Sequence, residues 1–162
     1  MLERIRVGTA AGLAAGLSVA VMILVYDLVK LEPFATPTLL AGNVLGTPAR
    51  LDSALGLLAS IAAGLKIAYG LAAYTLAHFS VFALVGIGAA FVFSSAVVSG
   101  NVVTGGLYGM LVGTAVFYLG LALVAPAFVS VPDWRLVMLT NAVAGVVMVS
   151  QIVDRPEPAP DA

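Results

Sequence analysis

Long continuous apolar stretches, separated by short polar segments, dominate the hydrophobic pattern of this chain. Four of them cover residues 7–31, 68–93, 102–124 and 134–153. Each is long enough to cross about 30 Å of hydrocarbon, which takes about 20 helical residues. Because the stretches do not alternate and lipid requires backbone hydrogen bonds within a segment, each predicts a helix rather than a strand. The pattern therefore predicts an all-α polytopic membrane protein, a bundle of four transmembrane helices.

The segment 32–67 is much longer than the other connections and opens with a proline-containing turn. It contains two short apolar pieces, one at 38–45 and one within 51–66. We expect the first to be a short helix capped by Thr36 or Thr38. The second is too short and too rich in glycine for a predicted span, so we expect it to be interfacial or re-entrant, with a fifth span as the alternative.

These elements predict a single transmembrane domain, 1–153, followed by a proline-rich acidic tail, 154–162. Four spans place both termini on the same side of the bilayer. The positively charged residues are divided almost evenly between the two faces of the predicted bundle. Those in long loops have less influence on orientation, which favours cytoplasmic termini in a bacterial inner membrane. At the opposite face, Tyr26 and Trp134 are predicted to anchor the helices at the interface.

Composition fits a membrane environment and excludes several classes of protein. The chain has 162 residues, of which 62% are hydrophobic and 9% charged, whereas a soluble domain has about 25% charged residues. The net charge is −1 with no basic run, so the lipid bilayer is the expected partner and nucleic acid is not. The absence of cysteine excludes disulfides, thiolate metal sites and thiol catalysis.

Glycines recur at every fourth position in two predicted spans. They are Gly8, Gly12 and Gly16 in the first span, and Gly105, Gly109 and Gly113 in the third. Small residues let helix backbones approach in lipid, where no hydrophobic drive brings helices together. We expect these stripes to pack helices within the chain; a partner interface and a chance pattern are the alternatives. Their similar positions also suggest an internal two-helix repeat.

Polar residues inside the predicted spans are few. The only histidine, His78, lies near the middle of the second span with Tyr74 one turn before it, and Asn141 lies at comparable depth in the fourth. We expect a neutral imidazole that donates to a backbone carbonyl or to Asn141. The alternatives are a proton relay and axial ligation of a haem iron or a chlorophyll-type pigment by His78, although one histidine cannot supply a two-histidine haem site.

The sequence contains no set of residues sufficient for an enzyme active site. It has no phosphate-binding loop, no paired carboxylates at catalytic spacing and no His-Glu metal motif. Asp27 and Lys30 close the first span, where we expect an interfacial pair with the lysine reaching toward water. We therefore expect a protein that is not an enzyme, with no metal site.

Two motifs in the first half of the chain carry a resemblance to known proteins. The first is Pro33-Phe34-Ala35-Thr36-Pro37 after the acidic end of a helix, and the second is His78-Phe79. In these motifs the chain resembles a group of small, uncharacterised bacterial membrane proteins with four helices, a Pro-Phe-x-Thr-Pro loop and a His-Phe second helix. The resemblance implies the four-helix fold, and it implies no activity or site.

These observations favour a non-catalytic structural or accessory subunit of a larger membrane complex, respiratory or photosynthetic, whose partners are other membrane subunits. The reason is that packing devices outnumber groups capable of chemistry. One alternative is a small transporter or channel formed as a homo-oligomer, which the polar residues at mid-depth suggest. The other is a pigment- or haem-binding membrane module that uses His78.

Overall fold

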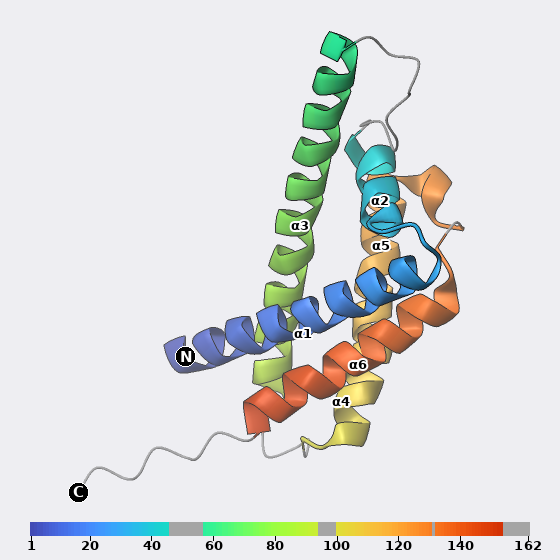
Figure 1. Ribbon diagram of the computed structural model, residues 1–162. Coiled ribbons are helices and arrows are strands. Elements are labelled where there is room, and N and C mark those ends of the chain that lie inside the picture. Colours follow the sequence, from blue (N-terminus) through green and yellow to red (C-terminus); the bar gives the residue numbers. More distant parts are fainter. Residues whose placement is uncertain (46–56, 94–99, 131, 154–162) are drawn as a thin grey trace, which may run out of the picture.

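The computed structural model describes residues 1–45, 57–93, 100–130 and 132–153 (Figure 1). The described residues are helical apart from short connections, and four helices are long and apolar enough to cross a membrane. These helices cover Leu2–Val29, Ala59–Phe93, Val102–Val124 and Trp134–Val153. The prediction of an all-α protein with four membrane-spanning helices is therefore confirmed. The predicted tail at 154–162 lies outside the described residues.

The chain passes through its elements in a simple order. Helix α1, Leu2–Val29, is followed by the short α2, Ala35–Leu45, and then by the long α3, Leu57–Phe93. The third span consists of α4, Val102–Tyr108, the π-helical turn η1, Gly109–Gly113, and α5, Thr114–Val124. The 3₁₀ turn Pro126–Phe128 then leads to α6, Trp134–Val153.

The helices form two crossing layers. In Figure 1, α1 and α6 run side by side and cross steeply over α3 and over the α4–α5 helix. Contacts between elements are densest where α1 meets α3 and where α6 meets α4 and η1, and α2 packs on α3. Residues of α3 and α5 face each other across a cavity instead of packing together. This arrangement leaves room for a binding site in the centre of the fold.

Helix α3 begins earlier than the hydrophobic pattern suggests. We expected a span at 68–93 and a separate short helix within 51–66, but one uninterrupted helix runs from Leu57 to Phe93. This corrects the predicted start of the helix, since residues 57–66 are continuous with the rest of α3. The physical reason is that Gly64 and Lys66 lower the hydropathy without breaking the backbone hydrogen bonds, and the alanines and leucines around them favour helix. The short helix expected at 38–45 is present as α2.

Glycine meets glycine where α1 crosses α3. A Cβ atom on Gly86 would lie 2.6 Å from both the Cα and the N of Gly12, and it would also meet the carbonyl oxygen of Gly8. Real Cβ atoms essentially never come closer than 3.0 Å to a heavy atom of a neighbouring helix. The two backbones can therefore touch only because these positions lack side chains, which is how small residues favour helix association in lipid.

The crossing of α4 and η1 with α6 is built in the same way. A Cβ atom on Gly145 would lie 2.6 Å from the N of Gly109 and would meet the carbonyl oxygen of Gly105. The third glycine of the stripe, Gly113, lies against the side chain of Asn141. In these described residues, both glycine stripes thus face other helices of the same chain.

The two crossings match contact by contact. Gly16, like Gly113, meets a side chain of the helix across from it; for Gly16 the nearest one is Phe82. Phe82 lies four residues before Gly86, as Asn141 lies four residues before Gly145. The pair α1–α3 and the pair formed by the third span with α6 are therefore similarly built. This equivalence supports the two-helix repeat that the glycine stripes suggest.

Candidate functional site: a cavity between the helices

A cavity of about 630 Å³ lies in the centre of the fold. Its walls come from α3 and α5; α1, α2 and α6 contribute the rest of the lining, and the cavity is open to the surface. Most of its lining side chains are apolar; the few polar ones include Tyr74, His78, Thr140 and Asn141. Small-molecule sites in proteins are typically about 300–1,000 Å³, mostly apolar and equipped with a few polar groups. The cavity therefore has the size and character of a binding site.

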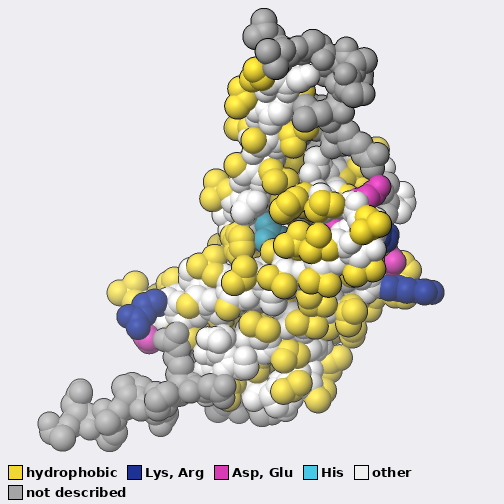
Figure 2. Space-filling view, in the orientation of Figure 1, with side chains coloured by type: hydrophobic (Ala, Val, Ile, Leu, Met, Phe, Trp, Pro, Cys, Tyr) yellow, Lys and Arg dark blue, Asp and Glu magenta, His cyan; other side chains and the backbone are white. Residues whose placement is uncertain are grey.

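His78 joins α3 to α1 at the edge of this cavity. Its Nε2 atom lies 3.0 Å from the carbonyl oxygen of Gly16. Because a carbonyl oxygen only accepts, the neutral ring carries its proton on Nε2 and Nδ1 is left without a hydrogen. The prediction that the imidazole donates to a backbone carbonyl is confirmed. Figure 2 shows the edge of the ring among hydrophobic side chains between α3 and α1.

This hydrogen bond bears on the haem and pigment alternative. A metal ion ligated through Nε2 would have to displace Gly16, so only Nδ1 of this ring could act as a ligand while the hydrogen bond is kept. Among the described residues no group of three or more His, Cys, Asp or Glu side chains could hold a metal ion. Ligation by His78 stays a prediction from the sequence.

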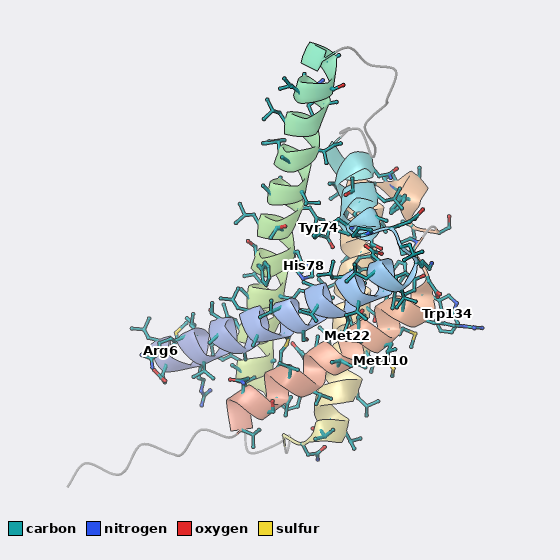
Figure 3. The ribbon with its side chains drawn as sticks, viewed as in Figure 1. Arg6, Met22, Tyr74, His78, Met110 and Trp134 are labelled. Atoms are coloured by element: carbon teal, nitrogen blue, oxygen red, sulfur yellow. The ribbon has the colours of Figure 1, made fainter. Side chains whose placement is uncertain are left out.

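Tyr74 lies one turn from His78 on the same side of α3 (Figure 3). The two ring centroids are 5.8 Å apart, and Phe82 contacts the imidazole from the next turn at 4.8 Å. Tyr74 is one of the residues that line the cavity, and its hydroxyl takes part in no hydrogen bond within the described part of the chain. Since a hydroxyl can donate one hydrogen bond, this group is available to a ligand in the cavity.

Asn141 enters the cavity from α6. Its residue is 6% exposed, and its Nδ2 atom donates to the carbonyl oxygen of Val137 in the same helix at 2.9 Å. The alternative that His78 donates to Asn141 is therefore wrong, because each side chain bonds to a backbone carbonyl instead. The structure nevertheless brings Tyr74, His78 and Asn141, which the sequence singled out, to one cavity.

Asp27 is almost completely buried, at 2% exposure, and it holds α2 against the end of α1. Its Oδ1 accepts from the hydroxyl of Thr36 at 2.6 Å and its Oδ2 accepts from the Thr36 backbone N–H at 2.9 Å. The carboxylate thus caps α2 from a neighbouring helix and complements the positive end of the helix dipole. The expected self-capping by Thr36 or Thr38 is replaced by this contact.

The expected pair of Asp27 with Lys30 is also corrected. Lys30 instead hydrogen-bonds to the hydroxyl of Tyr26, and its Nζ lies 4.2 Å from the centroid of that ring. The hydrogen bond to Tyr26 raises the pKa of Lys30, and partial desolvation opposes this increase. The reason for the different pairing is that the Asp27 carboxylate is buried and accepts two hydrogen bonds from Thr36, whereas Lys30 is exposed just after the end of α1.

Two further contacts position the walls of the cavity. On α6, Trp134 is exposed at the first turn, and Asp133 accepts from the Arg135 backbone N–H at 2.9 Å as an N-cap. The roles of Tyr26 and Trp134 as interface anchors stay predictions. Between α4 and α3, the Tyr108 hydroxyl donates to the carbonyl oxygen of Val85 at 3.1 Å.

Comparison with protein-family models, curated proteins and solved structures finds no match for this chain. The fold and its central cavity define an all-α protein with four apolar helices suited to a lipid environment. Any statement about function therefore rests on the geometry of the described residues. The resemblance to uncharacterised four-helix proteins stays a prediction.

Proposed function

We propose that the chain is a non-catalytic accessory subunit of a larger membrane complex, acting by helix packing. The observation that supports this best is the length of α3 together with the exposure of its first turns. A helix of 37 residues is about 55 Å long at 1.5 Å per residue. Since spanning helices tilt by up to about 40° and the hydrocarbon is about 30 Å thick, at least roughly 12 Å of α3 extends beyond it.

The part of α3 that extends is apolar and is not covered by other described residues. Ile61, Leu65 and Tyr69 are all more than half exposed, and a Cβ atom on Gly64 would meet nothing within 4 Å. Figure 1 shows this end of α3 reaching past the other helices. Apolar side chains that lie outside hydrocarbon favour burial against another protein. We therefore place the contact with a partner subunit on these first turns.

Paired substitutions on one helix test this proposal. Leu65 is 67% exposed in the extending part, and Leu84 is 68% exposed in the membrane-spanning part. We expect Leu65→Ala, alone or with Ile61→Ala, to release the chain from its complex during mild detergent extraction. Leu84→Ala, alone or with Leu76→Ala, removes comparable apolar surface and should leave the complex intact, because lipid covers those positions. If the Leu65 variants stay in the complex as well as the Leu84 variants do, the proposed contact is contradicted.

The finer assignments belong to the same proposal. We favour a respiratory or photosynthetic host complex, a bacterial inner membrane and cytoplasmic termini, for which the support is the sequence alone. Mass-spectrometric identification of the polypeptides that co-purify with the tagged full chain tests the host. If the recovered polypeptides belong to neither a respiratory nor a photosynthetic complex, that choice is contradicted.

A further inference from the structure

We propose that the central cavity binds an uncharged lipophilic molecule that carries a carbonyl oxygen near one end. The cavity has about 630 Å³ of space, and most of its wall is formed by valine, leucine, alanine and phenylalanine side chains. An apolar cavity of that size inside a membrane protein favours an apolar body of drug or lipid-fragment size. The inference concerns a ligand inside the chain, so it does not depend on the proposed role as a subunit.

The carbonyl oxygen is inferred from the hydroxyl of Tyr74. Tyr74 is one of the lining residues, and its hydroxyl has no hydrogen-bond partner among the described residues. Its neighbour His78 already donates its one ring proton to Gly16. Tyr74 is therefore the donor that is still available near the middle of α3, and a carbonyl oxygen is the acceptor that an uncharged lipophilic molecule provides.

The charges around the cavity argue for a neutral ligand. Asp27, Glu32 and Asp133 line it, whereas Lys30 is its only cation among the described lining residues and is hydrogen-bonded to Tyr26. A carboxylate or phosphate ligand would be repelled by the three acidic groups. A cation would have to lose its water in apolar surroundings while both oxygens of Asp27 accept hydrogen bonds from Thr36. A neutral carbonyl compound meets neither obstacle.

One wall position allows the cavity to be filled without disturbing the helices. Gly120 on α5 lines the cavity, and a Cβ atom there would meet nothing within 4 Å. Gly64 on α3 has equally open surroundings but is not part of the lining. Gly120→Leu therefore occupies the proposed binding space, and Gly64→Leu is a matched control that adds the same side chain elsewhere.

The experiment measures binding of a benzoquinone with a decyl side chain to the purified full chain in lipid nanodiscs, by equilibrium dialysis against empty nanodiscs. We expect saturable binding of one molecule per chain. Gly120→Leu should abolish it, Gly64→Leu should retain it, and Tyr74→Phe should weaken it about 10-fold, which is about 1.4 kcal/mol. Decanoate, which has a similar chain and a negative charge, should bind at least 10-fold more weakly than the quinone.

Each other outcome overturns part or all of the proposal. If Gly120→Leu binds the quinone as tightly as the parent chain, the probe dissolves in lipid or on the outer surface and the cavity is not its site. If Tyr74→Phe binds as tightly as the parent, the carbonyl is not recognised. If decanoate binds as well as the quinone, the preference for a neutral ligand is wrong. If Gly64→Leu loses binding as Gly120→Leu does, filling the cavity is not the cause of the loss and the proposal is rejected.

Discussion

The backbone of Gly86 on α3 lies directly against that of Gly12 on α1, so that a Cβ atom on Gly86 would be 2.6 Å from the Gly12 Cα. Gly145 on α6 lies against Gly109 in the same manner, with a corresponding distance of 2.7 Å to the Gly109 Cα. The fold thus depends on two backbone-to-backbone crossings that hold the two layers together. The space between α3 and α5 is left open because the close contacts occur elsewhere.

Adding one methyl group at either crossing is expected to destabilise the protein. Gly86→Ala and Gly145→Ala should each lower the free energy of unfolding by about 1–3 kcal/mol or more, because backbone atoms across the crossing cannot move aside. Gly64→Ala, where a Cβ meets nothing, should be neutral or stabilising by up to about 1 kcal/mol because alanine favours helix. Unfolding in mixed micelles of increasing denaturing detergent provides the measurement. Equal stability of all three variants would show that the crossings are looser than described.

The hydrogen bond from His78 to Gly16 should contribute less to the free energy of unfolding than either glycine crossing does. Hydrogen bonds between membrane helices average about 0.6 kcal/mol and reach about 1.7 kcal/mol. We therefore expect His78→Leu to lower the free energy of unfolding by about 1 kcal/mol. Tyr74→Phe, which removes a hydroxyl without a partner, should change it by less than about 0.5 kcal/mol in the absence of ligand. The same unfolding assay checks both, and a larger loss for Tyr74→Phe than for His78→Leu would contradict the assigned contacts.

The attachment of α2 to α1 depends on the buried Asp27. Thr36→Val removes the donor to Oδ1 and should cost about 1.5–3 kcal/mol, as is typical of a hydrogen bond to a charged group. Thr38→Val is the matched control, because the Thr38 hydroxyl donates only to the Phe34 carbonyl within its own turn. Amide hydrogen exchange across α2 should increase in the first variant and stay unchanged in the second. Equal exchange in both would mean that Asp27 does not hold α2.

Lys30 gives a prediction that depends on pH. Tyr26→Phe should lower the pKa of Lys30 toward the ordinary lysine value, because the hydrogen bond to the tyrosine hydroxyl is the main cause of its increase. Since the pKa is raised in the fold, any stabilisation is present at neutral pH and is lost as the pH rises through that pKa. The chain has two lysines, so isotope-labelled lysine gives two NMR signals, and Lys66 serves as the reference. An unchanged titration of Lys30 in the variant would contradict the contact.

The hydrophobic pattern was sufficient to predict the number and type of the spanning helices, because lipid permits few alternatives to a continuous helix. The pattern misplaced the start of α3 because Lys66 and Gly64 lower the local hydropathy without interrupting the helix. It also singled out His78 and Asn141, which both line the cavity.

The partners of the polar groups could not be read from the sequence. Gly16 and His78 are far apart in the chain, and their contact follows from a crossing angle that no local pattern encodes. Asp27 and Thr36 are only nine residues apart. The signal that was missed there is a carboxylate available to the N-terminus of a predicted short helix, where negative charge is favourable.

The proposed role as a subunit is tested most directly by the mass of the native particle. Membranes of the source cell carrying the tagged full chain are extracted with a mild detergent, and the purified particle is measured by light scattering corrected for detergent. The account predicts a particle much heavier than one or two copies of the chain, containing other membrane polypeptides in fixed proportion. A particle that contains this chain alone, as a monomer or a simple homodimer, would contradict the account.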